Sequence, residues 1–379
     1  MPLVLNEEQR LLKDTASEFL SSQAPVEALR KLRDSKDELG YDQPLWQQMV
    51  ELGWAGITLP EAYDGLDFGF MGLGAVMEES GRRLTASPLF STVVLGASAI
   101  VLGGSEQQKQ ALLPAIASGK TTVALALEES SHHRPAHVAT QASESGDGYR
   151  LNGQKVSVLD GASADKLIVV ARTSGKPGDT DGISLFLIDG KADGVKRSRR
   201  WMADSRALAD ISFDNVNVRR EDLVGEAGKG WAILDPTLDR GRICLAAEML
   251  GGVLECFERT VAYLKEREQF GVKIGSFQAL KHRAAHMYTE IELAKSVVLD
   301  AFSAIDEGRA DVGQMASLAK ATLNDLYYLV SSEAVQMHGG IGVTDELEIG
   351  FFLKRSRMAI QLLGDSGFHR DRYATLSGY

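Results

Sequence analysis

An arginine and a pair of glycines are the residues of this chain best suited to hold an anion. Arg267 carries a planar guanidinium whose N–H groups can donate to two oxygens of one phosphate. Gln336 offers an amide donor without a charge, and Gly339 and Gly340 let backbone N–H groups come close to an anion. A phosphate-bearing ligand is one interpretation. A surface ion pair between Arg267 and Glu268, and a plain helix-ending turn at the glycines, are the alternatives.

The elements that must position these residues form three blocks. Residues 1–120 have helical spacing of apolar side chains, residues 121–228 have short runs typical of strands, and residues 229–379 return to long helical stretches. Within the last block, residues 260–287 predict a helix, a bend with glycine and a second helix. The dipeptide Asn152-Gly153 predicts a type I′ turn between two strands. The sequence therefore predicts an α+β chain with an N-terminal helical domain, a middle β domain and a C-terminal helical domain.

The composition is that of a globular protein with an acidic surface. The chain has 379 residues, of which 44% are apolar, and this length exceeds what one compact domain usually holds. The net charge of −11 argues against nucleic acid or an anionic membrane surface as a partner. The longest apolar run, 93–102, is too short to span a bilayer, and the N-terminus lacks the pattern of a signal peptide. We therefore expect a cytoplasmic location without membrane insertion.

Cysteine and histidine spacing predicts no metal site. Cys244 and Cys256 match neither a zinc pattern nor a CxxC pattern, and two cysteines are too few for a disulfide framework. We expect both thiols to be reduced. The adjacent His132 and His133 lie in a polar loop and lack the spacing of metal ligands.

The order of the elements, together with a set of short motifs, resembles the acyl-CoA dehydrogenase family of flavoproteins. The two strongest matches are residues 267–271 (REQFG) followed by Phe277-Gln278, and residues 336–342 (QMHGGIG). Weaker matches lie at 52–61, 103–114 and 151–155. The likeness covers nearly the whole chain, and the motifs are specific as an ordered set rather than singly. The resemblance implies bound FAD and a C-terminal four-helix bundle.

The resemblance also implies a set of FAD contacts. They are Leu127, Leu159, Arg267, Gln269, Phe270, Phe277, Gln278, Gln336, Gly339, Gly340 and Ser366. In this family the residue that matches Arg267 reaches the FAD of a neighbouring subunit, so a homo- or hetero-oligomer, a dimer or a tetramer, is implied. Phe270 and Phe277 are expected to pack beside the cofactor and not to take part in the chemistry.

The predicted β domain departs from the family pattern. The family has a Thr-Glu-Pro segment followed by Gly, Ala, Gly, Ser and Asp, which touches flavin and substrate, whereas residues 127–134 read LEESSHHR. Leu127 cannot offer the flavin the hydroxyl of that threonine. The family's Trp-Ile-Thr strand is Ser157-Val158-Leu159 here, which lacks the ring and the second hydroxyl. Backbone N–H groups, such as those of residues 127–131, remain available to hold the flavin ring.

The reaction implied by the resemblance is α,β-dehydrogenation of an acyl-CoA thioester. The α C–H is a weak acid, so its removal needs a positioned carboxylate, while the flavin accepts the β-hydride. The family carries a glutamate base at one of two positions, which are Gly364 and Gly241 in this chain. Asp239 and Arg242 match positions near the substrate, with an ion pair between them as the alternative. An electron-transferring flavoprotein or oxygen would take the electrons.

Three interpretations follow from the missing glutamate. Asp365 could serve as the base from a shifted backbone, as an aspartate does in the related flavoprotein nitroalkane oxidase; a solvated loop acid is the alternative. Glu248 lies two turns past Gly241 on one helix face and could serve instead, although a core-paired carboxylate is the simpler interpretation. The chain could also be a non-catalytic, cofactor-holding subunit. It is similar to the smaller subunit of bacterial heteromeric dehydrogenases that act on steroid side chains or dicarboxylic acyl-CoAs.

Overall fold

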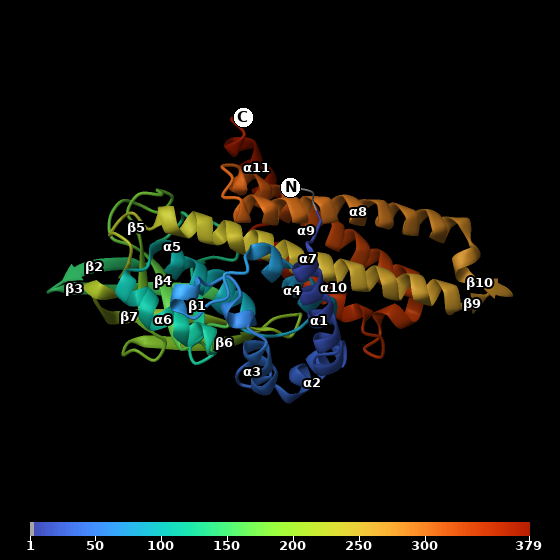
Figure 1. The fold of residues 1–379 in the computed structure, drawn as a ribbon, viewed down its shortest axis with the longest axis horizontal. Coiled ribbons are helices and arrows are strands. Elements are labelled where there is room, and N and C mark those ends of the chain that lie inside the picture. The colour runs from blue at the N-terminus through green and yellow to red at the C-terminus, as the bar shows by residue number, and fades with distance from the viewer. Residues whose placement is uncertain (1–3) are drawn as a thin grey trace. The chain divides into compact units, whose positions relative to one another are not determined.

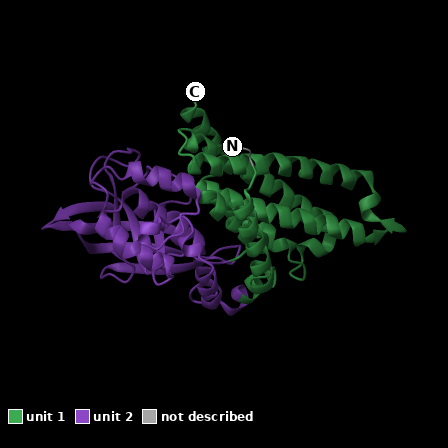
Figure 2. Cartoon of the chain, viewed as in Figure 1, with its two compact units in different colours: residues 1–31, 70–85, 242–379 green, residues 32–69, 86–241 purple. Residues whose placement is uncertain are grey.

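The computed structural model describes residues 4–379, which form two compact units (Figures 1 and 2). Unit 1 holds the chain up to Lys31, Phe70–Thr85 and Arg242–Tyr379, and unit 2 holds Leu32–Gly69 and Ala86–Gly241. Helices, then a sheet, then helices follow one another along the chain, so the predicted α+β class is confirmed. The three domain ranges taken from the sequence stay a prediction.

Unit 2 is built on a mixed sheet with the strand order β6-β7-β3-β2-β4-β5-β8, and β1 pairs with β4 in parallel. Its inner face is apolar; in that core the rings of Tyr149 and Phe186 meet edge to face at 5.1 Å. The strands are β1 Val123–Ala126, β2 Gln141–Ser145, β3 Gly148–Leu159, β4 Lys166–Arg172, β5 Ile183–Asp189, β6 Val195–Trp201, β7 Ala207–Arg219 and β8 Leu223–Val224.

Short helices complete unit 2. A π-helix, η3 Leu89–Ala97, is tied to β1 because the Thr92 hydroxyl accepts a hydrogen bond from the Val123 N–H at 3.0 Å. Helix α6 begins with a capping box in which Ser105 and Gln108 satisfy each other's backbone N–H groups. The helices are α3 Gln43–Glu51, η1 Trp54–Gly56, η2 Glu61–Tyr63, η3, α5 Ser98–Gly103, α6 Glu106–Ala117 and η4 Arg220–Asp222.

The turn predicted at Asn152-Gly153 is wrong. Strand β3 runs through both residues, and its pairing with β7 shifts register between Leu151 and Gly153. Gly153 has φ +148°, so the positive φ that the dipeptide supplies serves a β-bulge and not a hairpin turn. The Asn152 side-chain oxygen accepts from the Asn215 N–H at 2.9 Å and anchors this bulge. The hairpin turn itself lies between β2 and β3, at Gly146 with φ +62°.

Unit 1 is helical. Helix α7, Trp231–Glu266, starts in unit 2 and continues through unit 1, and α2, Val26–Ser35, also crosses the boundary. Helices α8 and α9 are joined by a tight turn and contact each other along their length (Figure 1). The elements are α1 Glu7–Gln23, α4 Phe70–Arg83, β9 Glu268–Gln269, β10 Val272–Lys273, η5 Ile274–Ser276, α8 Gln278–Asp306, α9 Val312–His338, η6 Gly339–Val343, α10 Ile349–Gln361 and α11 Ser366–Leu376.

Two glycines allow α4 and α7 to cross at very short range. A Cβ at Gly81 would lie 1.9 Å from the Glu248 carbonyl oxygen, and a Cβ at Gly251 would lie 1.8 Å from the Glu78 carbonyl oxygen. Any side chain would therefore force the two helices apart.

Along the described chain no helix is long and apolar enough to cross a membrane. Cys244 and Cys256 are buried on α7, and neither forms a disulfide within residues 4–379.

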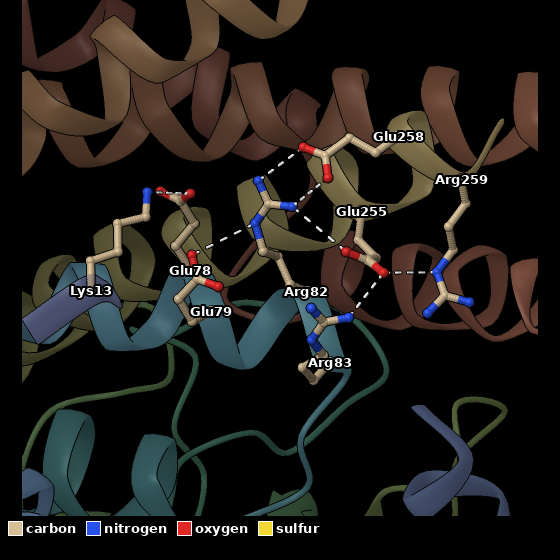
Figure 3. A network of polar contacts seen from close by, with 8 residues as sticks. All are labelled: Lys13, Glu78, Glu79, Arg82, Arg83, Glu255, Glu258 and Arg259. Carbon is tan, nitrogen blue, oxygen red and sulfur yellow. Dashed lines mark hydrogen bonds and ion pairs between the residues drawn. The ribbon is translucent and has the colours of Figure 1, made fainter. Parts of the chain in front are cut away.

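A network of charged side chains spans the same crossing (Figure 3). The Glu255 carboxylate lies 2.8 Å from Arg259, 3.1 Å from Arg83 and 3.6 Å from Arg82. Arg82 also reaches Glu258 at 2.9 Å and Glu79 at 3.7 Å. Because the side chain of Glu255 is only 10% exposed, its charge is largely shielded from water and compensated by these arginines.

Glu255→Gln should lower the free energy of unfolding by about 2 kcal/mol, because three arginines lose a common carboxylate. Glu79→Gln is the matched control on the same network. Burial raises the pKa of Glu79, so its ionised form is penalised at neutral pH, and the amide should cost nothing or stabilise slightly. Urea unfolding at pH 7 measures both variants. Equal stability of the Glu255→Gln variant and the wild type would contradict the role of this network.

Candidate cofactor and catalytic site

Arg267 lies just after the end of α7, at the base of the β9–β10 hairpin. Its backbone N–H donates to the Tyr263 carbonyl at 2.9 Å, and its carbonyl accepts from the Ile274 N–H at 2.9 Å. The alternative interpretation, an ion pair with Glu268, does not form, since Glu268 pairs with Lys273 at 2.7 Å. Within residues 4–379 the exposed guanidinium makes no hydrogen bond or ion pair. The backbone is therefore fixed while the donors of the side chain stay available.

The hairpin tip presents an apolar side chain to solvent. Phe270 and Gly271 have φ of +57° and +77°, and the Phe270 side chain is 91% exposed. Its ring meets that of Phe277 edge to face at 6.2 Å. Gln269 is exposed on β9, and α8 begins at Gln278, immediately after Phe277. These side chains form one exposed group beside Arg267.

The glycine turn at the end of α9 offers open backbone. Gly339 has φ +63°, and a Cβ added at Gly339 or at Gly340 would meet no atom within 4 Å. The preceding residue, His338, is buried; its ring packs on that of Tyr263 with centroids 4.4 Å apart. Burial lowers the pKa of His338, so the imidazole is neutral at pH 7. Tyr263 thus links the glycine turn to the segment that carries Arg267.

This donor set fits a pyrophosphate. It combines a guanidinium fork at Arg267, an uncharged and exposed amide at Gln336, and two glycines whose backbone is open to an approaching anion. The fit is chemical: donors are abundant, and no acidic side chain of this set opposes an anion.

In unit 2 the two positions expected to meet the flavin present buried side chains. Leu127 is 6% exposed and Leu159 is 9% exposed, and both pack into the interior. Because a leucine side chain carries no hydrogen-bond donor, neither position can bond a flavin through its side chain. The residues Ser130 and Ser131 are exposed, whereas the neighbouring Glu129 is half-buried.

The turn between α10 and α11, where the family's glutamate would stand, is locked by a buried lysine. Lys320 on α9 is fully buried, and its ammonium donates to the carbonyls of Gly364 at 3.1 Å and Ala359 at 3.0 Å, and to the Asn324 side chain. Burial lowers the pKa of Lys320 well below its usual value, with Arg242 adding to the effect. Sequence reasoning missed Lys320 and Asn324, because nothing in a helical stretch marks a lysine as enclosed.

Gly364 itself has no room for a side chain. Leu363 and Gly364 have φ of +58° and +112°, and a Cβ at Gly364 would lie 2.6 Å from the Phe368 ring and 2.8 Å from His369 Nε2. The His369 ring also bonds to the Leu363 carbonyl, with the ring nitrogen and the oxygen 3.0 Å apart. A carboxylate at position 364 would thus require the turn to rearrange.

Asp365 follows this turn as the N-cap of α11. Its Oδ1 accepts from the Phe368 N–H at 2.8 Å, and the residue is exposed. Within residues 4–379 its second oxygen, Oδ2, makes no hydrogen bond. Ser366 donates its hydroxyl to Asp325 at 2.7 Å. Asp365 therefore combines a fixed backbone with one available carboxylate oxygen.

Glu248 is a buried, paired carboxylate, as the simpler interpretation of the sequence expected. It is 4% exposed and pairs with the equally buried Arg355 at 2.8 Å. Arg242 is fully buried, and its guanidinium lies 5.6 Å from the centre of the Phe368 ring. Asp239 is buried on the part of α7 that belongs to unit 2. A carboxylate that is enclosed and paired is poorly placed to accept a substrate proton.

Three family profiles match the chain. They are the N-terminal domain of acyl-CoA dehydrogenase over residues 6–120, the middle domain over 125–216 and the C-terminal domain over 228–375. Subunit CarC of the caffeyl-CoA reductase–Etf complex of Acetobacterium woodii is 30% identical over 92% of this chain and 92% of its own length.

Solved structures agree with these matches. Butyryl-CoA dehydrogenase of Megasphaera elsdenii superposes with a TM-score of 0.91 at 27% identity, over 100% of both chains. The Tcur3481–Tcur3483 steroid ACAD superposes with a TM-score of 0.88 at 32% identity, over 98% of both chains. Members of this family bind FAD, which is the cofactor that the donor set at Arg267 fits. The chain therefore belongs to the acyl-CoA dehydrogenase family.

Proposed function

We propose that this chain takes part in FAD-dependent α,β-dehydrogenation of an acyl-CoA thioester as a subunit of an oligomer. The observation that carries the proposal is the donor set of Arg267, Gln336, Gly339 and Gly340, which suits the pyrophosphate of FAD. When bound, FAD accepts the β-hydride of the substrate. The family relationship supports the same reaction. The first test is the flavin absorbance of the purified protein: the proposal expects a yellow protein whose absorbance is bleached when an acyl-CoA is added.

The chain's own residues hold the cofactor and remove the proton. Arg267, Gln336 and the Gly339-Gly340 turn would bind the pyrophosphate, with Gln269, Phe270, Phe277, Gln278 and Ser366 beside the cofactor. Leu127 and Leu159 would bring apolar side chains and backbone near its ring. Arg242 and Asp239 would order the substrate. The exposed state of Arg267 and Phe270 is consistent with contact to FAD in a neighbouring subunit.

Asp365 is the proposed base. A proton acceptor needs a fixed position and an available oxygen, and Asp365 has both, since the backbone before it is held by Lys320 while Oδ2 is not engaged within the described chain. A second proposal is that an unlike subunit supplies the base. Two observations favour it: the Oδ1 atom of Asp365 is committed to a helix cap, and Gly364 cannot hold a side chain in the present turn.

The electron partner is proposed from a relative. CarC is named as a subunit of a complex with Etf, so we propose an electron-transferring flavoprotein as the partner of this chain. The same relative is named as a reductase, and the flavin chemistry can run in either direction, so both acyl-CoAs and their 2,3-unsaturated forms should be assayed. The cytoplasm remains our proposed location.

Asp365→Asn separates the base from the cap, because asparagine also caps helices well. If Asp365 is the base, turnover should fall by about 10²- to 10⁴-fold while FAD stays bound. Steady-state rates and the 450 nm absorbance of the purified variant measure the two effects. Unchanged turnover would eliminate Asp365 and point to a carboxylate from a second subunit.

Arg267→Ala should weaken FAD binding on the order of tenfold, since a charged bidentate contact is lost. Lys273→Ala is the matched control on the same hairpin, and Arg267→Lys tests whether the planar fork matters beyond the charge. The FAD dissociation constant is measured by titrating apoprotein. A wild-type affinity in the Arg267→Ala variant would remove this residue from the site.

Gly364→Glu introduces the family's glutamate at a turn that has no room for its side chain. It should lose about 3 kcal/mol of stability, from a strained φ and the overlap with Phe368, and should gain no turnover. Gly308→Glu is the control, because its φ of +63° is also positive but an added Cβ meets no atom within 4 Å; it should lose only about 1 kcal/mol. A stable and faster Gly364→Glu enzyme would show that the turn accepts a base after all.

A further inference from the structure

We propose that Glu129 and Lys155 are a positioning pair that holds the backbone N–H groups of residues 129–131 toward the flavin ring of FAD. This inference rests on the proposed FAD-dependent function and adds the residues that orient the ring's hydrogen-bond donors. It is carried by a set of contacts within unit 2, and by a difference between this chain and the family pattern.

Lys155 fixes the segment of residues 127–131 to strand β3. It is fully buried on β3, and its ammonium donates to the Leu127 carbonyl at 2.9 Å and to the Glu129 carboxylate at 2.7 Å. The next residue on β3, Val156, donates its N–H to the Glu128 carbonyl at 2.7 Å. Two successive carbonyls of the stretch are therefore turned toward β3.

Glu129 closes the loop at its base. Its carboxylate accepts the N–H of Ala139 at 2.6 Å and the N–H of Thr140 at 2.9 Å, in addition to the Lys155 ammonium. Burial alone would raise the pKa of Glu129, but Lys155 and the hydrogen bonds from Thr140 lower this pKa below its usual value, so the group is ionised at neutral pH. Burial in turn lowers the pKa of Lys155 to about 8. The residues between 129 and 139 are thus tethered at both ends.

Three backbone N–H groups of residues 129–131 remain available as donors. Within residues 4–379 the N–H groups of Glu129, Ser130 and Ser131 have no hydrogen-bond partner, and Ser130 and Ser131 are exposed. The pyrimidine end of an oxidised flavin ring carries two carbonyl oxygens and the nitrogen N1, which are acceptors, beside one N–H donor at N3. Donors held in advance cost no reorganisation when the ring binds or gains electrons. The pair therefore presents the kind of surface that a flavin can use.

The pair also replaces two features that the sequence lacks. Leu127 stands where the family has a threonine hydroxyl, and Glu129 stands where it has proline. A proline restricts φ by its ring, whereas a glutamate leaves the backbone free unless tertiary contacts restrain it. The ion pair with Lys155 supplies that restraint, and backbone N–H groups take over the donor role of the missing hydroxyl.

The test compares four purified holoproteins and their apo forms: wild type, Glu129→Gln, Lys155→Met and the double variant. Lys166→Met is the matched control, because Lys166 is a lysine of the same sheet that pairs with Asp189 at its surface. Each is measured for the FAD dissociation constant, the flavin reduction potential, and hydrogen exchange of peptides covering 127–140. Glu129→Gln keeps an acceptor oxygen in the side chain, so this variant still tests the proposal if Lys155→Met does not fold.

We expect both single variants to raise the FAD dissociation constant on the order of tenfold, to lower the reduction potential and to speed exchange in 127–140. The double variant should be little worse than either single one, because both remove the same contact. Variants that exchange faster but keep wild-type affinity and potential would overturn the proposal, and so would unchanged exchange. If the wild-type protein binds no FAD, both the proposed function and this inference are overturned. If the flavin of the wild type is bleached by an acyl-CoA, and the variants have wild-type FAD affinity and reduction potential, only this inference is overturned.

Discussion

The cost of enclosing a charge decides how the functional segments of this protein are held. A buried ammonium must find acceptors for its N–H groups, since an uncompensated charge in the interior is prohibitively unfavourable. Lys155 meets this requirement with the Leu127 carbonyl and the Glu129 carboxylate. Lys320 meets it with the carbonyls of Ala359 and Gly364 and the Asn324 side chain. In each case at least one acceptor lies on an irregular segment, at residues 127–129 or at Gly364, and that segment is thereby fixed to a strand or a helix.

The two locked segments differ in what they leave available. Around Lys155 the carbonyls turn inward, and the backbone donors of residues 129–131 remain open. Around Lys320 the turn places Gly364 against Phe368 and His369, which leaves space for no side chain there. One segment is therefore suited to hold a ring with many acceptors. The other presents the N-cap of α11, Asp365, which is the carboxylate nearest in sequence to the family's glutamate position.

Unit 1 supplies rigidity through a second compensated network. The crossing of α4 and α7 depends on Gly81 and Gly251, and a charged network lies beside it, in which Glu255 is shared among three arginines. The pair of Glu248 and Arg355 belongs to the same pattern of paired, enclosed charges. Such pairing explains why a glutamate on the expected helix face serves packing and is not a ready proton acceptor.

The sequence by itself predicted the order of the elements and marked candidate anion-binding residues. Apolar periodicity predicted the α–β–α order, and residue types alone marked Arg267 and the Gly339-Gly340 turn, because a guanidinium fork and a side-chain-free backbone are local properties. The sequence could not distinguish a glycine in a hairpin turn from a glycine in a β-bulge, so the turn predicted at Asn152-Gly153 was wrong. Only the tertiary structure decided which carboxylates are paired, which lysines are enclosed and where Gly364 lacks space. Burial and hydrogen-bond partners arise between residues far apart in the chain, as Lys155 with Glu129 and Lys320 with Gly364 show, and no local pattern encodes them.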